Sequence, residues 1–227
     1  MSLFIDGKIF VGMVVATGIG ASGLVDATKA YFGGVNRIGF AKIKRQIIQL
    51  TPGAPNGLPQ IFILESLYAH WANGAALSKQ ISTAKSLVMM HLSPANAAMV
   101  AASVNVDPAI LCSMAAKRSA GIELDPPESD LSTRFDLIVS ALLDAAYQKA
   151  EQEYSNGTRF YALVFAVLLA LIEMWVLHSG ARTLYLGSDD MNLALIVGLL
   201  AAPIAPIAKD ASKAVGAAIR SRVEKEL

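Results

Sequence analysis

A single carboxylate interrupts the most apolar part of the sequence. Glu173 lies in the run from Phe160 to His178, which contains no other acidic or basic residue apart from His178 itself. An ionisable side chain inside a membrane span is costly and often marks an ion path or a proton relay. About five residues, or roughly 8 Å of helix, separate Glu173 from the end of the run, so it lies near a membrane surface. Its candidate partners there are Lys8, Asn192 and Arg182.

We favour a structural role for Glu173 over a transport role. Three spans in one chain enclose no path for an ion, although an oligomer could supply a path between its copies. A carboxylate that is paired between two helices needs no such path. The sequence therefore predicts an inter-helix pair, with ion or proton transport as the alternative.

Other patterns that carry chemistry are missing from the sequence. Cys112 is the only cysteine, which excludes an intrachain disulfide and a cysteine-cluster metal site. The three histidines (His70, His91 and His178) lie far apart and lack metal-ligand spacing. No Walker A loop, dinucleotide-binding glycine motif or GxSxG elbow occurs. We expect a non-enzymatic protein with no cofactor and no metal.

The composition predicts an integral membrane protein. Of the 227 residues, 54% are hydrophobic and 16% are charged, whereas about a quarter are charged in an average soluble domain. The mean hydropathy is +0.49 and the net charge is +1. A spanning helix needs roughly 17–25 largely apolar residues, and three stretches approach this length: 9–25, 160–178 and 191–208.

Two alternatives to membrane spans apply. Apolar helices can lie in the core of a soluble protein, and the first stretch could be a signal peptide. A signal peptide has a basic segment before its apolar core. Only Lys8 precedes the first stretch here, beside Asp6. We therefore expect the first stretch to be retained as a transmembrane helix.

Basic residues predict the orientation of the chain. Five lie between residues 27 and 64, where no acid occurs, and five more follow the third stretch. Because cytoplasmic loops are rich in Lys and Arg, both regions are predicted to be cytoplasmic and the N-terminus to be outside. The predicted parts are an N-terminal span (1–28), an all-helical cytoplasmic domain (29–158), a transmembrane hairpin (159–208) and a cytoplasmic amphipathic helix (209–227). A bacterial inner (plasma) membrane suits this arrangement.

Small residues recur along the first span. Gly12, Ala16 and Gly20 are spaced by four, and Gly18 with Ser22 forms a second pair. Small residues at this spacing let another helix backbone approach closely. The pattern is compatible with association between copies of the chain and with packing against another span of the same chain.

A basic amphipathic helix is predicted at about 36–50. Four apolar residues at helical spacing lie opposite Lys42, Lys44 and Arg45. Such a helix next to a membrane exit can bind anionic lipid, or it can face a protein core and expose its charges. Helices without convincing strands follow, so the fold class is all-α. The helix pair at 95–120 offers too few basic residues for DNA readout, and we expect no nucleic acid partner.

Charge is also divided along the predicted cytoplasmic domain. Residues 123–153 contain eight acidic residues, whereas all of the charged residues in 27–64 are basic. The two blocks could dock within one chain or between chains, or remain separately solvated, since exposed pairs contribute under about 1 kcal/mol.

These features predict a non-enzymatic integral membrane protein that self-assembles as a homo-oligomeric scaffold. The alternatives are an ion or proton channel subunit with its pore between protomers, and an accessory subunit bound to other membrane proteins.

Overall fold

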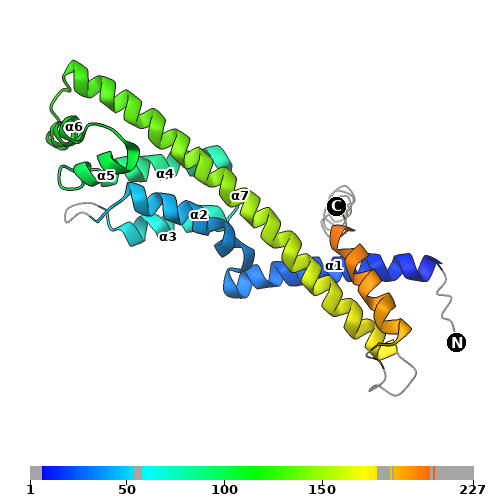
Figure 1. Ribbon diagram of the computed structural model, residues 1–227. Coiled ribbons are helices and arrows are strands. Elements are labelled where there is room, and N and C mark those ends of the chain that lie inside the picture. Colours follow the sequence, from blue (N-terminus) through cyan, green and yellow to red (C-terminus); the bar gives the residue numbers. More distant parts are fainter. Residues whose placement is uncertain (1–6, 54–57, 178–184, 186, 205–206, 208–227) are drawn as a thin grey trace, which may run out of the picture. The chain divides into compact units, whose positions relative to one another are not determined.

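The computed structural model describes residues 7–53, 58–177, 185, 187–204 and 207. Within these residues every regular element is a helix, so the prediction of an all-α fold is confirmed. Figure 1 shows the helices in chain order. They are α1 (Gly7–Phe32), α2 (Gly34–Leu50), α3 (Gln60–Ala72), α4 (Leu77–His91), α5 (Ala97–Val104), α6 (Pro108–Ala120) and α7 (Pro126–Leu177), followed by helical residues 189–204.

The chain divides into two compact units by its internal contacts. One comprises residues 36–154 and is called the helical unit here. The other combines residues 1–35 with 155–227 and is called the apolar unit. The long helix α7 contributes to both, with Tyr154 as its last residue in the helical unit. This division by contacts does not test the predicted membrane topology, which stays a prediction.

Two helices in the described part of the chain are long and apolar enough to cross a membrane, not the three that the sequence predicts. They are residues Gly7–Tyr31 of α1 and the apolar part of α7. The third predicted span, 191–208, is helical at every residue of it that the structure describes, 191–204 and 207. Residues 205, 206 and 208 of this stretch, and the predicted helix at 209–227, lie outside the described residues.

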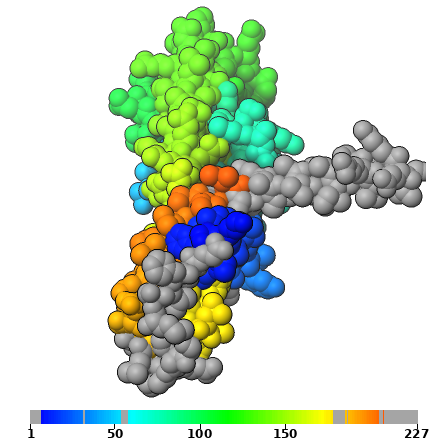
Figure 2. All heavy atoms as spheres, turned by 90° about the vertical axis from the view of Figure 1, so that its right-hand side faces the viewer, coloured from blue at the N-terminus to red at the C-terminus, as the bar shows by residue number. Residues whose placement is uncertain are grey.

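The apolar unit has an interior of small residues. Ala166 and Ala170 of α7 and Ala194 and Ala201 of the 189–204 helix are all fully buried. At Gly198, an added Cβ would lie 2.6 Å from the Cα of Val167, so only glycine permits this approach of the two backbones. Figure 1 and Figure 2 show α1 (blue), the end of α7 (yellow) and the 189–204 helix (orange) packed together.

The helical unit has a conventional core of large apolar side chains. Helix α2 contributes Ile43 and Ile47, and α7 contributes Phe135, Leu143 and Tyr147, all with no exposed surface. Residues from α3, α4, α5 and α6 complete the same cluster.

A polar network fixes the start of α7. The carboxylate of Glu128, in the first turn, accepts hydrogen bonds from the Asp125 backbone N–H (2.9 Å) and the Ser113 hydroxyl (2.5 Å). Lys117 Nζ lies 2.8 Å from Glu128 and 2.5 Å from Asp125. Hydrogen bonds from Lys117 and then Ser113 lower the pKa of Glu128 to about 2. This network joins the end of α6 to the start of α7.

Helix α7 continues where the sequence predicts a break. The predicted cytoplasmic domain ends at residue 158 and the predicted span begins at Phe160, and the residues just before this boundary, Ser155, Asn156 and Gly157, are weak helix formers. The structure contains one helix of 52 residues instead. Together these three residues cost about 2 kcal/mol relative to alanine, and the strong helical segments on both sides outweigh this cost.

Candidate functional site

Helix α1 has an inner face and an outer face within the apolar unit. Val14, Thr17, Ala21 and Val25 recur at spacings of three and four and are at most 4% exposed. The outer face carries Gly12, Ala16 and Gly23, which are exposed. Apart from the backbone of α1 itself, no atom of the described residues would lie within 4 Å of a Cβ added at Gly12 or Gly23. The outer face is therefore open to close approach by another helix.

The predicted small residues do not share one environment. Gly18 is buried, and a Cβ at Gly20 would lie 3.1 Å from Cδ1 of Leu169 in α7. Ser22 is half-buried and donates its hydroxyl to the Ile19 carbonyl at 2.8 Å. Packing inside the chain thus involves Gly18 and Gly20, whereas Gly12 and Ala16 are exposed and not covered by the described helices.

Glu173 forms a hydrogen bond with α1. Thr17, which has no exposed surface, donates its hydroxyl to Oε2 of Glu173 at 3.0 Å. Glu173 itself is half-buried. The contact joins residues 156 positions apart in the sequence and links α1 to α7 inside the apolar unit. This is an inter-helix polar contact of the kind that the sequence predicts, but with a different partner.

Among the described residues, the contact seen for Glu173 is with Thr17 and not with the predicted partners Lys8 or Asn192. Lys8 is exposed and Asn192 is exposed with its backbone N–H donating to Ser188. Arg182 lies outside the described residues. Sequence reasoning missed Thr17 because it considered charged groups at the membrane surface. The sequence does contain a signal for Thr17, because Val14, Thr17 and Ala21 are spaced by three and four residues and so lie on one face of the helix.

The basic residues of α2 lie on the surface of the helical unit. Lys42 Nζ is 3.1 Å from the Glu153 carboxylate of α7, so one contact joins the basic and acidic blocks within the chain. Lys44 and Arg45 are exposed and form no ion pair within the described residues. The apolar residues Ile43 and Ile47 are buried in the core. Any contact with anionic lipid must therefore use the cations and not the apolar face of α2.

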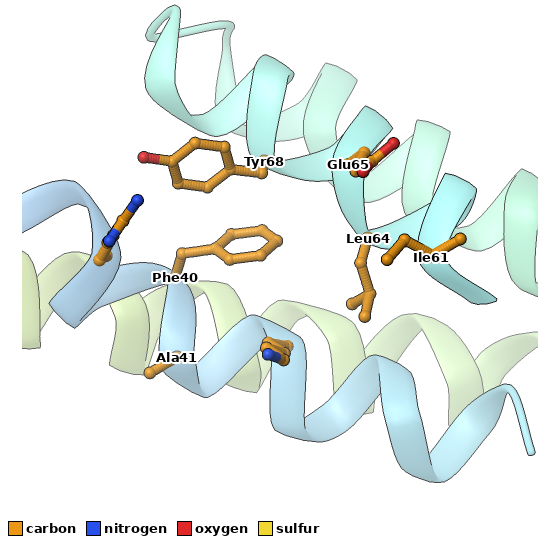
Figure 3. A pocket seen from close by; sticks show the side chains of 8 residues that line it. Phe40, Ala41, Ile61, Leu64, Glu65 and Tyr68 are labelled. Carbon is orange, nitrogen blue, oxygen red and sulfur yellow. The ribbon is translucent and has the colours of Figure 1, made fainter. Parts of the chain in front are cut away.

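A groove of about 480 Å³ lies between α2 and α3 in the helical unit. Its apolar wall includes the rings of Phe40 and Tyr68, which meet edge to face with their centroids 5.1 Å apart. Figure 3 shows these two rings lying between the helices, with Glu65 on α3. Arg37 and Lys44 line the α2 side. The groove therefore combines an apolar wall with the two cations Arg37 and Lys44 and the one carboxylate Glu65.

His91, His70 and Cys112, which the structure describes, lie within packed helices or loops. Both ring nitrogens of the buried His91 contact carbonyl oxygens, Nδ1 at 2.8 Å from Leu58 and Nε2 at 2.7 Å from Pro52. His91 thus holds the two ends of the loop between α2 and α3. His70 is half-buried in α3, and Cys112 is half-buried in α6. No group of three potential metal ligands occurs among the described residues.

Comparisons with known proteins identify no relative. No family model, curated protein or solved structure matches this chain.

Proposed function

We propose that this chain is a non-enzymatic integral membrane protein that forms a homo-oligomeric scaffold through α1. The apolar unit lies in the bilayer and the helical unit lies on its cytoplasmic side. The carrying observation is the open outer face of α1, where Gly12, Ala16 and Gly23 are exposed while the opposite face is buried.

The distribution of side-chain size in the apolar unit supports a membrane environment. Its interior is rich in alanine and glycine, whereas its large aliphatic side chains point outward. Only 28% of the most apolar window of α1, and 22% of that of α7, is buried. A core helix of a soluble protein would be mostly buried, whereas small residues inside and large ones toward lipid are typical of membrane helices. Exposed examples are Ile9, Val11, Ile19, Leu168, Ile172, Val176, Ile196 and Leu199.

The open face of α1 supports self-association. In lipid, helices associate through close packing at small residues and not through the hydrophobic effect. Because the partner helices of the same chain lie against Thr17 and Ala21, the stripe with Gly12 and Ala16 is left for a second copy. A scaffold needs no further chemistry from these residues.

The oligomeric state of a double variant tests this proposal. Gly12→Leu with Ala16→Leu fills the open face, and neither position packs inside the chain. We expect the wild type to form an assembly in mild detergent and the variant to be a monomer, measured by light scattering with correction for detergent. The matched control is Val11→Leu with Val15→Leu, on the adjacent exposed stripe, which should retain the assembly. An unchanged mass for the Gly12/Ala16 variant would refute association through this face.

A labelling experiment tests the predicted orientation. Cys112 is the only cysteine, so Cys112→Ser removes the background. Lys79→Cys then places a thiol at an exposed position of α4. We expect a membrane-impermeant maleimide to label this thiol in inside-out vesicles and not in right-side-out vesicles. Labelling only in right-side-out vesicles would show that the orientation is opposite to the predicted one. If the protein is absent from the vesicle fraction and is fully labelled in the soluble fraction, the proposal of a membrane protein is refuted.

A further inference from the structure

The groove between α2 and α3 has the size of a small-molecule site. Its volume of about 480 Å³ lies within the range of about 300–1,000 Å³ that is usual for ligand sites. Every residue that lines it belongs to the helical unit. A ligand in the groove is therefore held by this unit alone, independently of oligomer formation by α1.

The groove has a polar end and an apolar end. The indole N–H of Trp71 donates to the Asn36 carbonyl at 3.0 Å, so the end of α3 lies beside the start of α2. Arg37 and Tyr68 line the groove at these two helix ends, whereas Ile61 lines it at the start of α3. Figure 3 shows the Tyr68 hydroxyl pointing away from Ile61.

Two cations flank a small residue on the α2 side of the groove. Arg37, Ala41 and Lys44 are spaced by four and three, so they share one helix face, with the cations about 10 Å apart along the helix. Neither Arg37 nor Lys44 forms an ion pair within the part of the chain that the structure describes. Because Ala41 has only a methyl group, both long side chains can reach one anion that lies above it. The planar guanidinium of arginine also matches the geometry of a carboxylate.

The remaining polar groups of the groove favour an anion with a single charge. Glu65 is the one carboxylate among the lining residues, so two cations and one carboxylate leave a net charge of +1. The half-buried Tyr68 has no hydrogen-bond partner for its hydroxyl among the described residues. This hydroxyl is a donor for the same anion.

Exposed apolar surface continues the groove away from the cations. Ile61 is 67% exposed, and Leu64, three residues later on the same face of α3, is half-buried. The rings of Phe40 and Tyr68 meet edge to face beside them, with centroids 5.1 Å apart. A hydrocarbon chain that lies along this surface removes it from water, which is favourable. The surface is a single strip, so it accommodates one chain.

We propose that this groove binds a single-chain amphiphile with a singly charged anionic head, of the class of the alkyl carboxylates. The head pairs with Arg37 and Lys44 above Ala41, and the tail lies along Leu64 and Ile61.

Photoaffinity labelling of the full chain in mild detergent tests the proposal. The probe is decanoate with a diazirine group at the end of its tail. Trypsin releases the α3 wall in one peptide, because residues 46–78 contain no lysine or arginine. We expect labelling at Ile61 and Leu64, located by tandem mass spectrometry, to saturate with probe concentration. Labelling of α1 peptides is the internal reference, because partition onto exposed aliphatic side chains does not saturate.

Competitors identify the class of ligand. Unlabelled decanoate should displace the probe from the groove, and decanol, which has no charge, should need about tenfold more, the effect of two partly exposed ion pairs. Groove labelling that does not saturate, or equal competition by decanol and decanoate, would overturn the proposal. Stronger competition by the two-chain lipid phosphatidylglycerol would assign the groove to a phospholipid and overturn the single-chain ligand.

Charge variants locate the head. Arg37→Gln with Lys44→Gln should weaken probe binding about tenfold, and Glu65→Gln should tighten it about threefold. The matched control is Lys79→Gln with Arg118→Gln, which removes the same two charges at exposed positions outside the groove. This control should leave binding unchanged. An equal loss in the two double variants would overturn the assignment of the head to this groove.

A steric variant tests the site without changing its charge. Ala41→Leu fills the space between the two cations at an exposed position, so it should fold, as judged by circular dichroism, and weaken probe binding about tenfold or more. The matched control Ala141→Leu, at an exposed position of α7, should leave binding unchanged. Unchanged labelling in the folded Ala41 variant would overturn the proposal.

Discussion

Gly39 is a position where adding one methyl group should destabilise the helical unit. It is buried in α2, and an added Cβ would lie 2.6 Å from Cζ2 of Trp71, 2.9 Å from the carbonyl oxygen of Ala150 and 3.0 Å from Cβ of Tyr154. The optimum separation of two carbon atoms is about 3.5–4.0 Å. Trp71 cannot move freely, because its N–H is bonded to the Asn36 carbonyl, and the Ala150 oxygen belongs to the backbone of α7.

Two opposing effects set the magnitude for Gly39→Ala. Alanine is favoured over glycine in a helix interior by about 1 kcal/mol. Overpacking of a filled core costs about 1–3 kcal/mol, and three contacts well inside the optimum put this site at the upper end. We therefore expect a net loss of about 1–2 kcal/mol of unfolding free energy.

Urea denaturation of the full chain, followed by Trp71 fluorescence on the Trp175→Phe background, measures this loss. The matched control is Gly53→Ala, where an added Cβ would meet no atom of the described residues within 4 Å. Reduced flexibility of the unfolded chain should make this control more stable by about 0.4–1 kcal/mol. If Gly39→Ala is stabilised as much as Gly53→Ala, the close packing of α2 against α3 and α7 is wrong.

Three further predictions follow from the polar contacts. The pKa of Glu128 is lowered from 4.5 to about 2 in the folded chain, so the stabilisation that it gives is complete above pH 4.5 and disappears as the pH falls toward 2. The urea midpoint of the wild type should therefore fall over this pH range. Glu128→Gln should remove the part of this fall that Glu128 causes. Because Gln also accepts the Thr17 hydroxyl, Glu173→Gln should leave both the melting temperature and the proton flux in liposomes unchanged, whereas a loss of flux would support transport. Lys44→Gln with Arg45→Gln should reduce the amount of anionic lipid that co-purifies with the protein, measured by mass spectrometry. The control Lys79→Gln, at an exposed lysine of α4, should leave this amount unchanged. An equal reduction in the double variant and in the control would refute specific lipid contact by α2.

Local signals in the sequence predict some helix ends and not others. Asp107 caps α6 through the backbone N–H groups of Ala109 and Ile110, and Gly121 ends it with φ 69°, as Asp107-Pro108 and Gly121 predict. Ser93-Pro94 predicts a start in the same way, but α5 begins at Ala97. The Asn96 side chain accepts from the Ser93 N–H and donates to the His91 carbonyl, which holds residues 93–96 in a turn. A side chain with two backbone partners thus outweighs the signal from proline.

The face that each apolar helix turns inward depends on its partner, and hydrophobicity alone does not reveal it. Helix α1 carries small residues on both faces, Ala21 inside and Gly12 and Ala16 outside. In α7 the pattern is clearer, because Ala166 and Ala170 mark the inner face and Glu173 follows on the same side of the helix. An inward carboxylate in an apolar interior needs a hydrogen-bond donor from a neighbouring helix. On the inner face of α1 that donor is Thr17, so the alanine stripe of α7 contained the information needed to place the pair.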